Sequence, residues 1–270
     1  MTSSKNSERM ANHIEEVCDL AVKAGRKIMR FYKNSTEITL KKDASPLTAA
    51  DRASHEFLVQ SLQELTPNVP VISEESDQAV NGAHACASTF WLVDPLDGTK
   101  EFIKGTDEFT VNIALVEDGR PVLGVVHAPA LNLTYYGGQT IGAWRKKDDE
   151  TPVSIVTRKA NGSKMAVVAS KDHAGPRVGA LLSRLREPEL RSMGSSLKFC
   201  LVAEGKADLY LRDLPTMEWD TAAAQSVVEA AGGEVYSLDG KPLRYGKPEM
   251  RNPAIMTVGD TQFDWQRCVS

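Results

Sequence analysis

A series of short apolar runs in the first half of the chain most constrains its fold. The runs VPVI, WLV, TVNIALV and PVLGVVHA lie within residues 69–128, separated by residues that favour turns. Asp118-Gly119, between the last two runs, is a strong hairpin signal. TYYGG and IGAWRK continue the pattern further along the chain. The sequence therefore predicts one sheet that is built from these consecutive strands.

Two helices are expected before this sheet. Residues 11–32 place apolar side chains at steps of three and four, which is typical of an amphipathic helix. Thr48-Ala-Ala-Asp51 resembles a capping box that opens a second helix, and Pro67 would end it. The buried stripe of this second helix is expected to consist of Phe57, Leu58, Leu62 and Leu65.

A second alternation of helices and strands follows the polar run KKDDET, which ends at Thr151. MAVVAS predicts a strand, VGALLSRLRE a helix, and GSSLKFCLVAEGKADLYL a helix and then a strand. The last helix is expected from Thr221 to Ala231, where two glycines stop it, and EVYSL and AIMTVG then predict strands. We therefore expect two domains, an N-terminal α+β domain over residues 1–155 and a C-terminal α/β domain over residues 156–270.

Charge and composition exclude several classes of partner. The chain has 32 Lys and Arg against 36 Asp and Glu, a net charge of −4, with no basic stripe interleaved with aromatics. This favours a small-molecule partner over a nucleic acid. The start, MTSSKNSERM, lacks the apolar core of a signal peptide, and no stretch approaches the ~18 apolar residues of a membrane span. We expect a cytoplasmic protein, with peripheral attachment at the inner membrane and the choice between monomer and homodimer left open. The four cysteines contain no CxxC pair, so they predict neither a zinc ribbon nor a disulfide scaffold.

The run WLVDPLDGTKEF, residues 91–102, adds two carboxylates to a strand end. Asp94 directly follows WLV, and Pro95 cannot donate to a strand ladder, so we expect the strand to end and the chain to bend there. On such a bend Asp94 and Asp97 can converge, and their charges repel unless a cation, a proton or a basic side chain lies between them. Mg²⁺ prefers such oxygen ligands. The alternative is an ordinary turn at Asp97-Gly98, and this run by itself favours that alternative.

Other acidic residues occupy comparable positions. Glu74 and Glu75 follow the apolar PVI run, so they lie just past another expected strand end. Asp220 precedes the last helix and by itself is explained as an N-cap. Asp51 is likewise explained locally, as the acidic member of the capping box. Each signal is weak alone, and only a folded sheet could bring Glu74 close to Asp94.

Together these motifs resemble a known family. WLVDPLDGTKEF and WDTAAAQSVVEAAGG resemble the two signatures of the inositol monophosphatase superfamily, a group of Mg²⁺-dependent, lithium-sensitive phosphatases. The first motif, with KKDASPLTAAD at 41–51 and GSSLKFCLVAEGKADLYLR at 194–212, is most similar to the 3′(2′),5′-bisphosphate nucleotidase branch, the CysQ type. The resemblance covers nearly the whole chain. It implies an α/β (α+β) layered sandwich of the αβαβα type, as in sugar phosphatases.

The resemblance also implies a role for each matching residue. Asp51 and Thr99 would orient and deprotonate an attacking water. Two or three Mg²⁺ ions would be held mostly by the first domain, through Glu74 (with Glu75 as the competing position), Asp94, the Leu96 carbonyl, Asp97 and, from the second domain, Asp220. The substrate would contact Gly98, Thr99, Ser170, His173, Gly194 and Lys198. For His173 and Lys198 the alternative is an ordinary surface loop residue and a solvated helix lysine.

The implied activity is hydrolysis of 3′-phosphoadenosine 5′-phosphate to AMP and phosphate, with the 5′-phosphosulfate analogue as a second substrate. This would recycle a by-product of sulfate assimilation. Metal ions suit such a reaction because they activate a water and neutralise the leaving oxygen, and four carboxylates carry enough charge for two ions. Hydrolysis of inositol-1-phosphate is the first alternative, although KEF after Thr99 and the GSSLKFC run argue against it. A non-catalytic regulatory protein of this fold is the second, and it would be more plausible if a metal ligand or the Asp51/Thr99 pair were missing.

Overall fold

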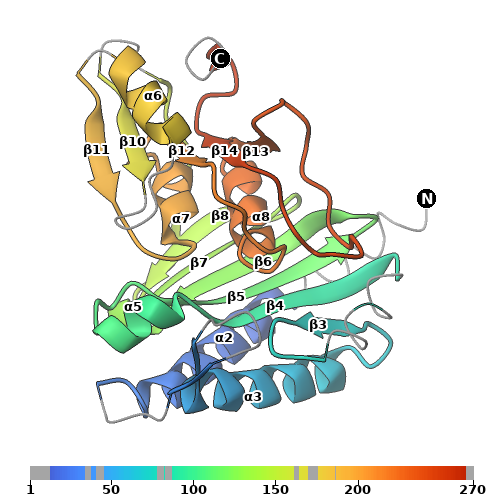
Figure 1. The fold of residues 1–270 in the computed structure, drawn as a ribbon. Coiled ribbons are helices and arrows are strands. Elements are labelled where there is room, and N and C mark those ends of the chain that lie inside the picture. Colours follow the sequence, from blue (N-terminus) through green and yellow to red (C-terminus); the bar gives the residue numbers. More distant parts are fainter. Residues whose placement is uncertain are drawn as a thin grey trace.

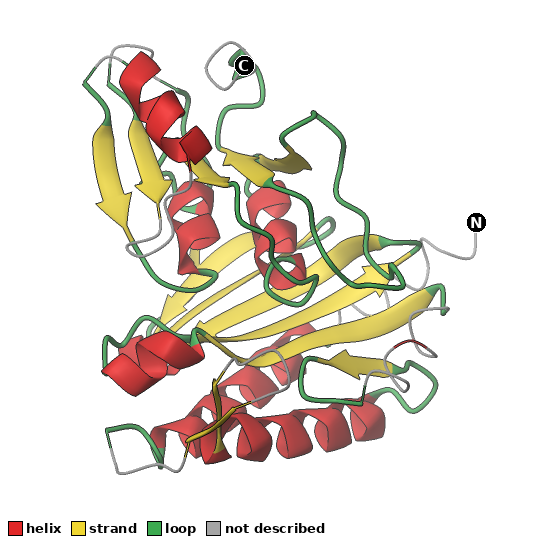
Figure 2. Ribbon diagram, viewed as in Figure 1, coloured by secondary structure: helices red, strands yellow, loops and turns green. Residues whose placement is uncertain are grey.

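The helices and strands of the protein form five layers. The computed structural model describes residues 13–33, 38–40, 46–77, 82, 87–160, 164–169, 176–185 and 187–265. In these residues two helices cover one face of a seven-stranded sheet, and two more helices separate it from a five-stranded sheet (Figures 1 and 2). A further helix covers the outer face of the smaller sheet. The expected αβαβα sandwich is confirmed.

The larger sheet contains the consecutive strands that the apolar runs predict. Its first two strands pair in parallel and the others pair antiparallel. Asp118 and Gly119 have φ angles of 49° and 74°, as the predicted tight hairpin requires. The sheet is formed, in spatial order, by β3 (Val71–Ser73), β4 (Thr89–Asp97), β5 (Thr110–Glu117), β6 (Arg120–Ala128), β7 (Leu133–Gly138), β8 (Gly142–Lys147) and β9 (Val153–Ser154).

Strand β4 does not end at Val93 as the position of Pro95 predicts. It continues to Asp97, and its pairing with β5 shifts register between Asp94 and Asp97. Pro95 has no N–H to donate, and the irregularity in the ladder accommodates it within the strand. The expected bend is therefore a bulge, and both aspartates remain attached to the sheet.

The outer helices begin and end close to the predicted positions. They are α2 (Ile14–Met29) and α3 (Ala49–Leu65), and the latter begins at a complete capping box between Thr48 and Asp51. Their apolar faces pack on one side of the large sheet around Trp91, which is fully buried. A short two-stranded ladder, β1 (Ile38–Leu40) and β2 (Pro46–Thr48), precedes α3 and was not expected from the sequence.

The smaller sheet has the order β11-β10-β12-β14-β13. Its strand β11 was not predicted, because ELRS is polar and lies at the sheet edge. The strands are β10 (Ala166–Ala169), β11 (Glu189–Ser192), β12 (Leu209–Arg212), β13 (Glu234–Ser237) and β14 (Ile255–Val258), and the helices of this half are α6 (Pro176–Arg184), α7 (Leu197–Ala203) and α8 (Ala222–Ala230).

Helices α7 and α8 lie between the two sheets and share one core with both. Gly124 of β6 permits the close approach of α8, since a Cβ there would lie 2.1 Å from the Ala223 carbonyl oxygen. This core joins Phe90 of the first predicted domain to Val168 of the second. The division at residues 155/156 stays a prediction.

Two remaining expectations concern membranes and cysteines. Among the residues that the structure describes, no helix is long and apolar enough to cross a membrane. Cys18 and Cys200 belong to the described part of the chain, and both are free thiols. Cys86 and Cys268 lie outside it.

Candidate active site

The DPLDGT segment forms the centre of the candidate site. It leads from β4 into the short helix α5 (Thr99–Lys104). Gly98 joins the two with a φ of 89°, a left-handed conformation that favours glycine. The Leu96 N–H donates to Asp94 Oδ1 at 3.0 Å, and Thr99 Oγ1 lies 3.3 Å from the Leu96 carbonyl oxygen. Asp94 is only 1% exposed, so a carboxylate is held inside the fold at this point.

Asp51 and Thr99, the two predicted catalytic residues, are in contact. Asp51 Oδ2 accepts hydrogen bonds from the Thr48 N–H at 2.7 Å and the Thr48 hydroxyl at 2.5 Å. Its other oxygen, Oδ1, accepts from Thr99 Oγ1 at 3.2 Å. Ser54, one helical turn further along α3, donates to the Pro95 carbonyl at 2.8 Å. The capping box thus orients Asp51 toward Thr99, and the local explanation of Asp51 is compatible with a place in the site.

Glu74 reaches the same region from the neighbouring strand. Its N–H donates to the Val93 carbonyl at 3.1 Å, which continues the parallel pairing of β3 and β4 by one residue. The Glu74 side chain forms a hydrogen bond with Asp94 and raises the pKa of that carboxyl, and its charge also acts on Asp220. These interactions favour Glu74 over Glu75 as the residue nearest the other carboxylates. Its role as a ligand stays a prediction.

Asp97 is tied to the second half of the chain. Ser195 Oγ and the Ser196 N–H donate to its Oδ2 at 2.5 and 2.7 Å, and Asn112 Nδ2 and Thr110 Oγ1 lie 3.4 and 3.5 Å from the same oxygen. Ser195 has a φ of 51°, which is uncommon for a residue other than glycine. Neither serine was predicted as a site residue, although they form the SS of the GSSLKFC run.

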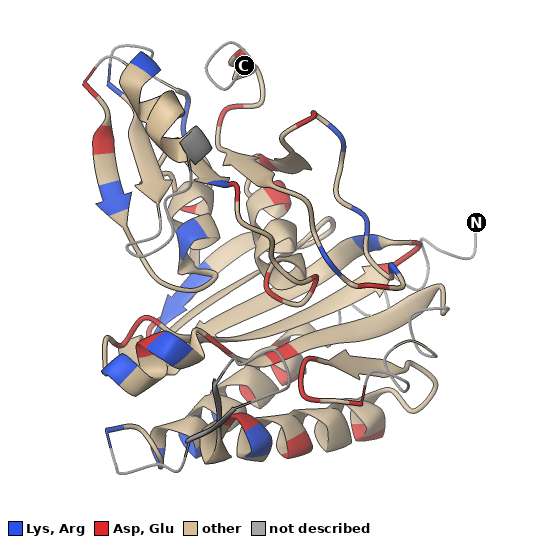
Figure 3. Cartoon of the chain, in the orientation of Figure 1, with Lys and Arg blue, Asp and Glu red and all other residues tan. Residues whose placement is uncertain are grey.

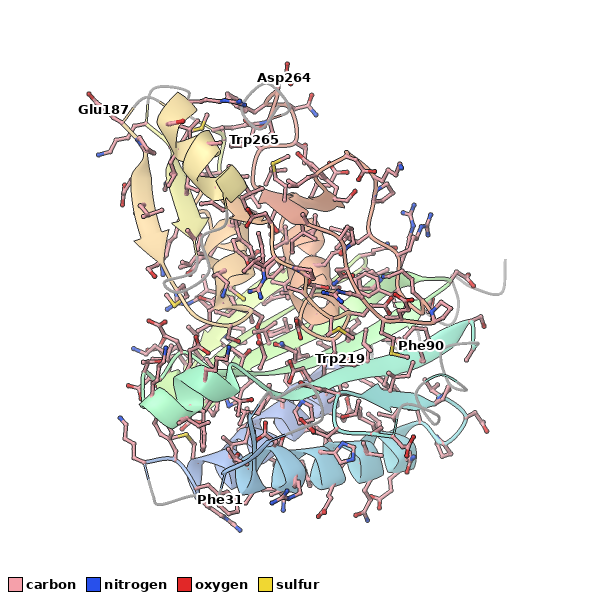
Figure 4. The ribbon with its side chains drawn as sticks, viewed as in Figure 1. Phe31, Phe90, Glu187, Trp219, Asp264 and Trp265 are labelled. Atoms are coloured by element: carbon pink, nitrogen blue, oxygen red, sulfur yellow. The ribbon has the colours of Figure 1, made fainter. Side chains whose placement is uncertain are left out.

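Asp220 reaches the site from the loop that precedes α8. The N-cap of this helix is Thr221, so the interpretation of Asp220 as an ordinary N-cap is wrong. Instead, Asp220 Oδ2 accepts a hydrogen bond from the Met217 N–H at 2.9 Å. Figure 3 shows acidic residues on this loop above the large sheet, and Figure 4 labels Trp219 beside β4. The loop therefore brings an acidic residue to Asp94 and Asp97 from more than a hundred residues away.

The carboxylates at this site repel one another. Burial raises the pKa of Asp94 well above its usual range, and the charges of Glu74, Asp97 and Asp220 raise it further. Burial, with the charges of Asp97 and Glu74, raises the pKa of Asp220 to about 8, although part of the Asp220 side chain remains exposed. A bound cation would remove this repulsion.

These residues fit a hard metal ion by their chemistry. Carboxylates and a backbone carbonyl are the oxygen donors that Mg²⁺ prefers. In the described part of the chain, however, no three His, Cys, Asp or Glu side chains are already arranged to hold one ion. Asp97 Oδ2 and Asp220 Oδ2 accept hydrogen bonds from protein N–H and O–H groups, which orient the two carboxylates without using all of their lone pairs. Binding of an ion therefore requires local adjustment of side chains that are already close.

Lys198 is buried, and the alternative of a solvated lysine is wrong. The side chain is 4% exposed, and its Nζ lies 3.4 Å from the Met193 carbonyl and 5.7 Å from the ring centroid of Tyr210. Burial lowers the pKa of Lys198 to about 8, while the charge of Asp97 acts in the opposite direction. Arg212, at the end of β12, adds a second positive charge that acts on both Lys198 and Asp220. Arg212 was not predicted from the sequence, because a charged residue at a strand end is an ordinary feature.

The remaining predicted contacts fall into two groups. Gly194 packs so tightly that a Cβ would lie 2.7 Å from the Glu108 carbonyl oxygen, which leaves space only for glycine. Ser170 and His173 lie outside the described residues. The structure therefore brings together Asp51, Thr99, Glu74, Asp94, Leu96, Asp97, Gly98 and Asp220, with Lys198 of α7 and with Gly194, which precedes this helix.

The layered fold and the acidic strand end define a phosphatase-like family, and comparison with known proteins identifies it. The sequence matches the inositol monophosphatase family over residues 10–261, and the chain belongs to this family. The relative named 3′(2′),5′-bisphosphate nucleotidase CysQ of Salmonella typhimurium is 47% identical over 234 residues, which cover 86% of this chain and 93% of the relative. The family resemblance predicted from the motifs is confirmed.

Two solved structures have nearly the same fold as this chain but differ in how similar their sequences are to it. CysQ from Bacteroides thetaiotaomicron has a TM-score of 0.78 and 40% identity, covering 92% of this chain and 97% of that one. The Thermotoga maritima IMPase has a TM-score of 0.76 but only 25% identity, with 92% of each chain covered. The two structures match the fold almost equally well, whereas the sequence is more similar to CysQ.

Proposed function

We propose that the chain is a Mg²⁺-dependent 3′(2′),5′-bisphosphate nucleotidase. It hydrolyses 3′-phosphoadenosine 5′-phosphate to AMP and phosphate, with the 5′-phosphosulfate analogue as a second substrate, and so recycles a by-product of sulfate assimilation in the cytoplasm. The observation that carries this proposal is the burial of Lys198 beside the acidic site, in a chain that is 47% identical to a protein named as such a nucleotidase.

The proposed ligands of two or three Mg²⁺ ions are Glu74, Asp94, Asp97, Asp220 and the Leu96 carbonyl. When bound, Mg²⁺ would lower the pKa of a water molecule and neutralise the charge that develops on the leaving oxygen. The chain itself positions the water. Because the Thr99 hydroxyl donates its proton to Asp51 Oδ1, the Thr99 oxygen can accept a hydrogen bond from that water, and Asp51 can take up the released proton.

The substrate phosphates meet two kinds of group in this proposal. The backbone amides of Gly98 and Thr99 face the reacting phosphate, where the absence of a side chain at Gly98 permits a close approach. Lys198 pairs with the second phosphate, because a buried ammonium gains most from an anionic partner. Gly194 supports this contact by close packing. Ser170 and His173 are proposed to contact the nucleoside.

Hydrolysis of inositol-1-phosphate remains the alternative activity. The close match of the fold to the Thermotoga maritima IMPase favours it. A buried lysine beside the carboxylates argues for a substrate with a second anionic group, which inositol-1-phosphate lacks. A non-catalytic role is disfavoured, because every proposed ligand and the Asp51/Thr99 pair are present.

Phosphate release tests the proposal directly. The purified protein is incubated with 3′-phosphoadenosine 5′-phosphate, inositol-1-phosphate or fructose-1,6-bisphosphate, each with Mg²⁺, with EDTA, and with Mg²⁺ plus Li⁺. We expect the nucleotide to be preferred, EDTA to abolish turnover and Li⁺ to inhibit it. A preference for either of the other substrates would overturn the substrate assignment, and activity in EDTA would overturn the metal mechanism.

A further inference from the structure

The loop that carries Asp220 is held by a distant segment of the chain. Residues 238–254 connect β13 to β14 and pass beside this loop, as the red trace in Figure 1 shows. The Asn252 N–H donates to the Thr216 carbonyl at 2.8 Å, and the Glu218 N–H donates to the Met250 carbonyl at 2.7 Å. The position of the Asp220 loop therefore depends on the β13–β14 connection.

Asn252 contacts the peptide group that holds the Asp220 carboxylate. The Thr216–Met217 peptide accepts the Asn252 N–H through its carbonyl and donates its own N–H to Asp220 Oδ2 at 2.9 Å. Such consecutive hydrogen bonds polarise one another. The Asn252 side-chain amide also donates to the Met217 carbonyl at 2.9 Å and to the Thr221 hydroxyl oxygen at 2.9 Å. One residue thus fixes the backbone on both sides of Met217 and the first residue after Asp220.

An ion pair between the buried Glu218 and the partly exposed Lys247 orients the Asn252 amide. Glu218 is 0% exposed, and its Oε2 accepts the Gly246 N–H at 2.6 Å. Its Oε1 accepts the Lys247 N–H at 3.1 Å and forms an ion pair with Lys247 Nζ at 2.6 Å. The same Nζ donates to Asn252 Oδ1 at 3.4 Å. Since Lys247 contacts the amide oxygen, the amide NH₂ group faces the oxygens of the Asp220 loop.

We propose that Asn252 is a positioning residue for Asp220, so that metal binding at the site depends on the β13–β14 connection. This inference rests on the proposed function, in which Asp220 is a metal ligand. Asn252 is 2% exposed and its NH₂ group faces three oxygen acceptors, of Thr216, Met217 and Thr221. An acceptor in its place would remove the donor to the Met217 carbonyl and would release the Met217–Glu218 peptide, while the backbone N–H of residue 252 would still bind the Thr216 carbonyl.

The test uses Asn252→Asp, which preserves shape but replaces the NH₂ donor with an oxygen acceptor. Binding of Mn²⁺ alone is measured from the electron paramagnetic resonance signal of the free ion. We expect affinity to fall by about 10–100-fold, the usual effect of losing an outer-shell partner of a metal ligand. The added negative charge would by itself attract a cation, so a weaker affinity isolates the loss of positioning.

A double variant distinguishes positioning from a general loss of structure. In the Asp220→Asn background, Asn252→Asp should weaken the residual Mn²⁺ binding no further, because the group it positions is gone. Ser237→Ala is the matched control, since it removes a buried hydroxyl that donates to the Lys241 carbonyl at 3.0 Å near the other end of the same connection. It should leave Mn²⁺ affinity unchanged. Unfolding of every variant is followed in EDTA.

The outcomes separate this inference from the proposed function. Wild-type affinity in Asn252→Asp, or an equal loss in the Asp220→Asn background, overturns the positioning role and leaves the nucleotidase proposal standing. Absence of Mn²⁺ binding by the wild-type protein overturns both. If Asn252→Asp does not fold, Lys247→Met replaces it, because this side chain is 34% exposed and acts on the amide from outside. Lys247→Met should then weaken Mn²⁺ binding by a smaller factor, and it should cause no further loss in the Asp220→Asn background. An equal loss of affinity in both backgrounds overturns the inference.

Discussion

The carboxylates of the site are held in two different ways. Asp94 and Asp97 belong to a strand inside the seven-stranded sheet, where each is paired with a residue of β5, Asn112 and Thr110 respectively. Asp220 belongs to a loop whose position depends on side chains of the β13–β14 connection. The backbone ladder fixes the strand positions of the first pair, with Ser195 and Ser196 as additional donors to Asp97, whereas the position of Asp220 has no such ladder and depends on residues far along the chain. We therefore expect the two regions to respond differently to substitution outside the site.

The largest expected loss of activity is the same for the β4 strand and for the Asp220 loop. Asp94→Asn and Asp220→Asn each remove a proposed ligand, so each should reduce kcat/KM for 3′-phosphoadenosine 5′-phosphate by more than the ~10–100-fold that outer-shell changes cause. Steady-state kinetics at saturating Mg²⁺ measure this. Near-normal activity in either variant would refute its assignment as a ligand and would confine the metal site to the other region.

Thr99→Ala should affect only the hydrolytic step. Thr99 begins α5, directly after the strand that carries Asp94 and Asp97. The Thr99 hydroxyl contacts Asp51 Oδ1 and holds the water in our proposal, so kcat should fall by about 10²–10⁴-fold while KM changes little. Thr99→Ser keeps the hydroxyl and should recover much of the rate. A change in KM alone would show that Thr99 binds substrate and does not orient the water.

Lys198→Met should affect selectivity, the property that we assign to the second half of the chain. Loss of the buried ammonium should raise KM for 3′-phosphoadenosine 5′-phosphate by at least about tenfold, as for a lost charge-assisted hydrogen bond. Hydrolysis of the monophosphate 3′-AMP should change little. An equal loss for both substrates would place Lys198 in the catalytic step common to both.

The same residue predicts a pH dependence. Burial lowers the pKa of Lys198 to about 8, so the side chain is charged below this pH and neutral above it. Since kcat/KM reports groups of the free enzyme, kcat/KM for the bisphosphate should fall as pH rises through about 8. This component of the profile should be absent in Lys198→Met. If the variant keeps the same decline, another group is responsible for it.

The sequence predicted what local patterns determine. The capping box at Thr48, the hairpin at Asp118-Gly119 and the position of Glu74 just past a strand all follow from short-range signals, and the structure confirms them. The sequence could not predict contacts made across the fold. The burial of Lys198 results from Met193 and Tyr210 packing around one residue of α7, and the contact between Asn252 and Met217 joins residues 35 positions apart.

The bulge in β4 illustrates the same limit. Pro95 correctly indicated that regular pairing is interrupted, but whether the chain leaves the sheet or remains in it depends on β5. The residues opposite, Thr110 and Asn112, are both buried and both lie within reach of Asp97 Oδ2. Such partners keep the strand in the sheet, and a single strand's sequence does not contain them.

Ser195→Ala should have the smallest effect and is the most direct test of the comparison. It removes one donor to Asp97 Oδ2, but the Ser196 N–H remains at 2.7 Å and the sheet still holds the aspartate. We expect a loss of about 1 kcal/mol or less, the net contribution of one hydrogen bond, or roughly a fivefold weaker Mn²⁺ affinity. The loss in Asn252→Asp should be clearly larger, although Asn252 is further from the metal ligands. Equal losses would mean that the strand-borne carboxylate depends on contacts across the fold as much as Asp220 does.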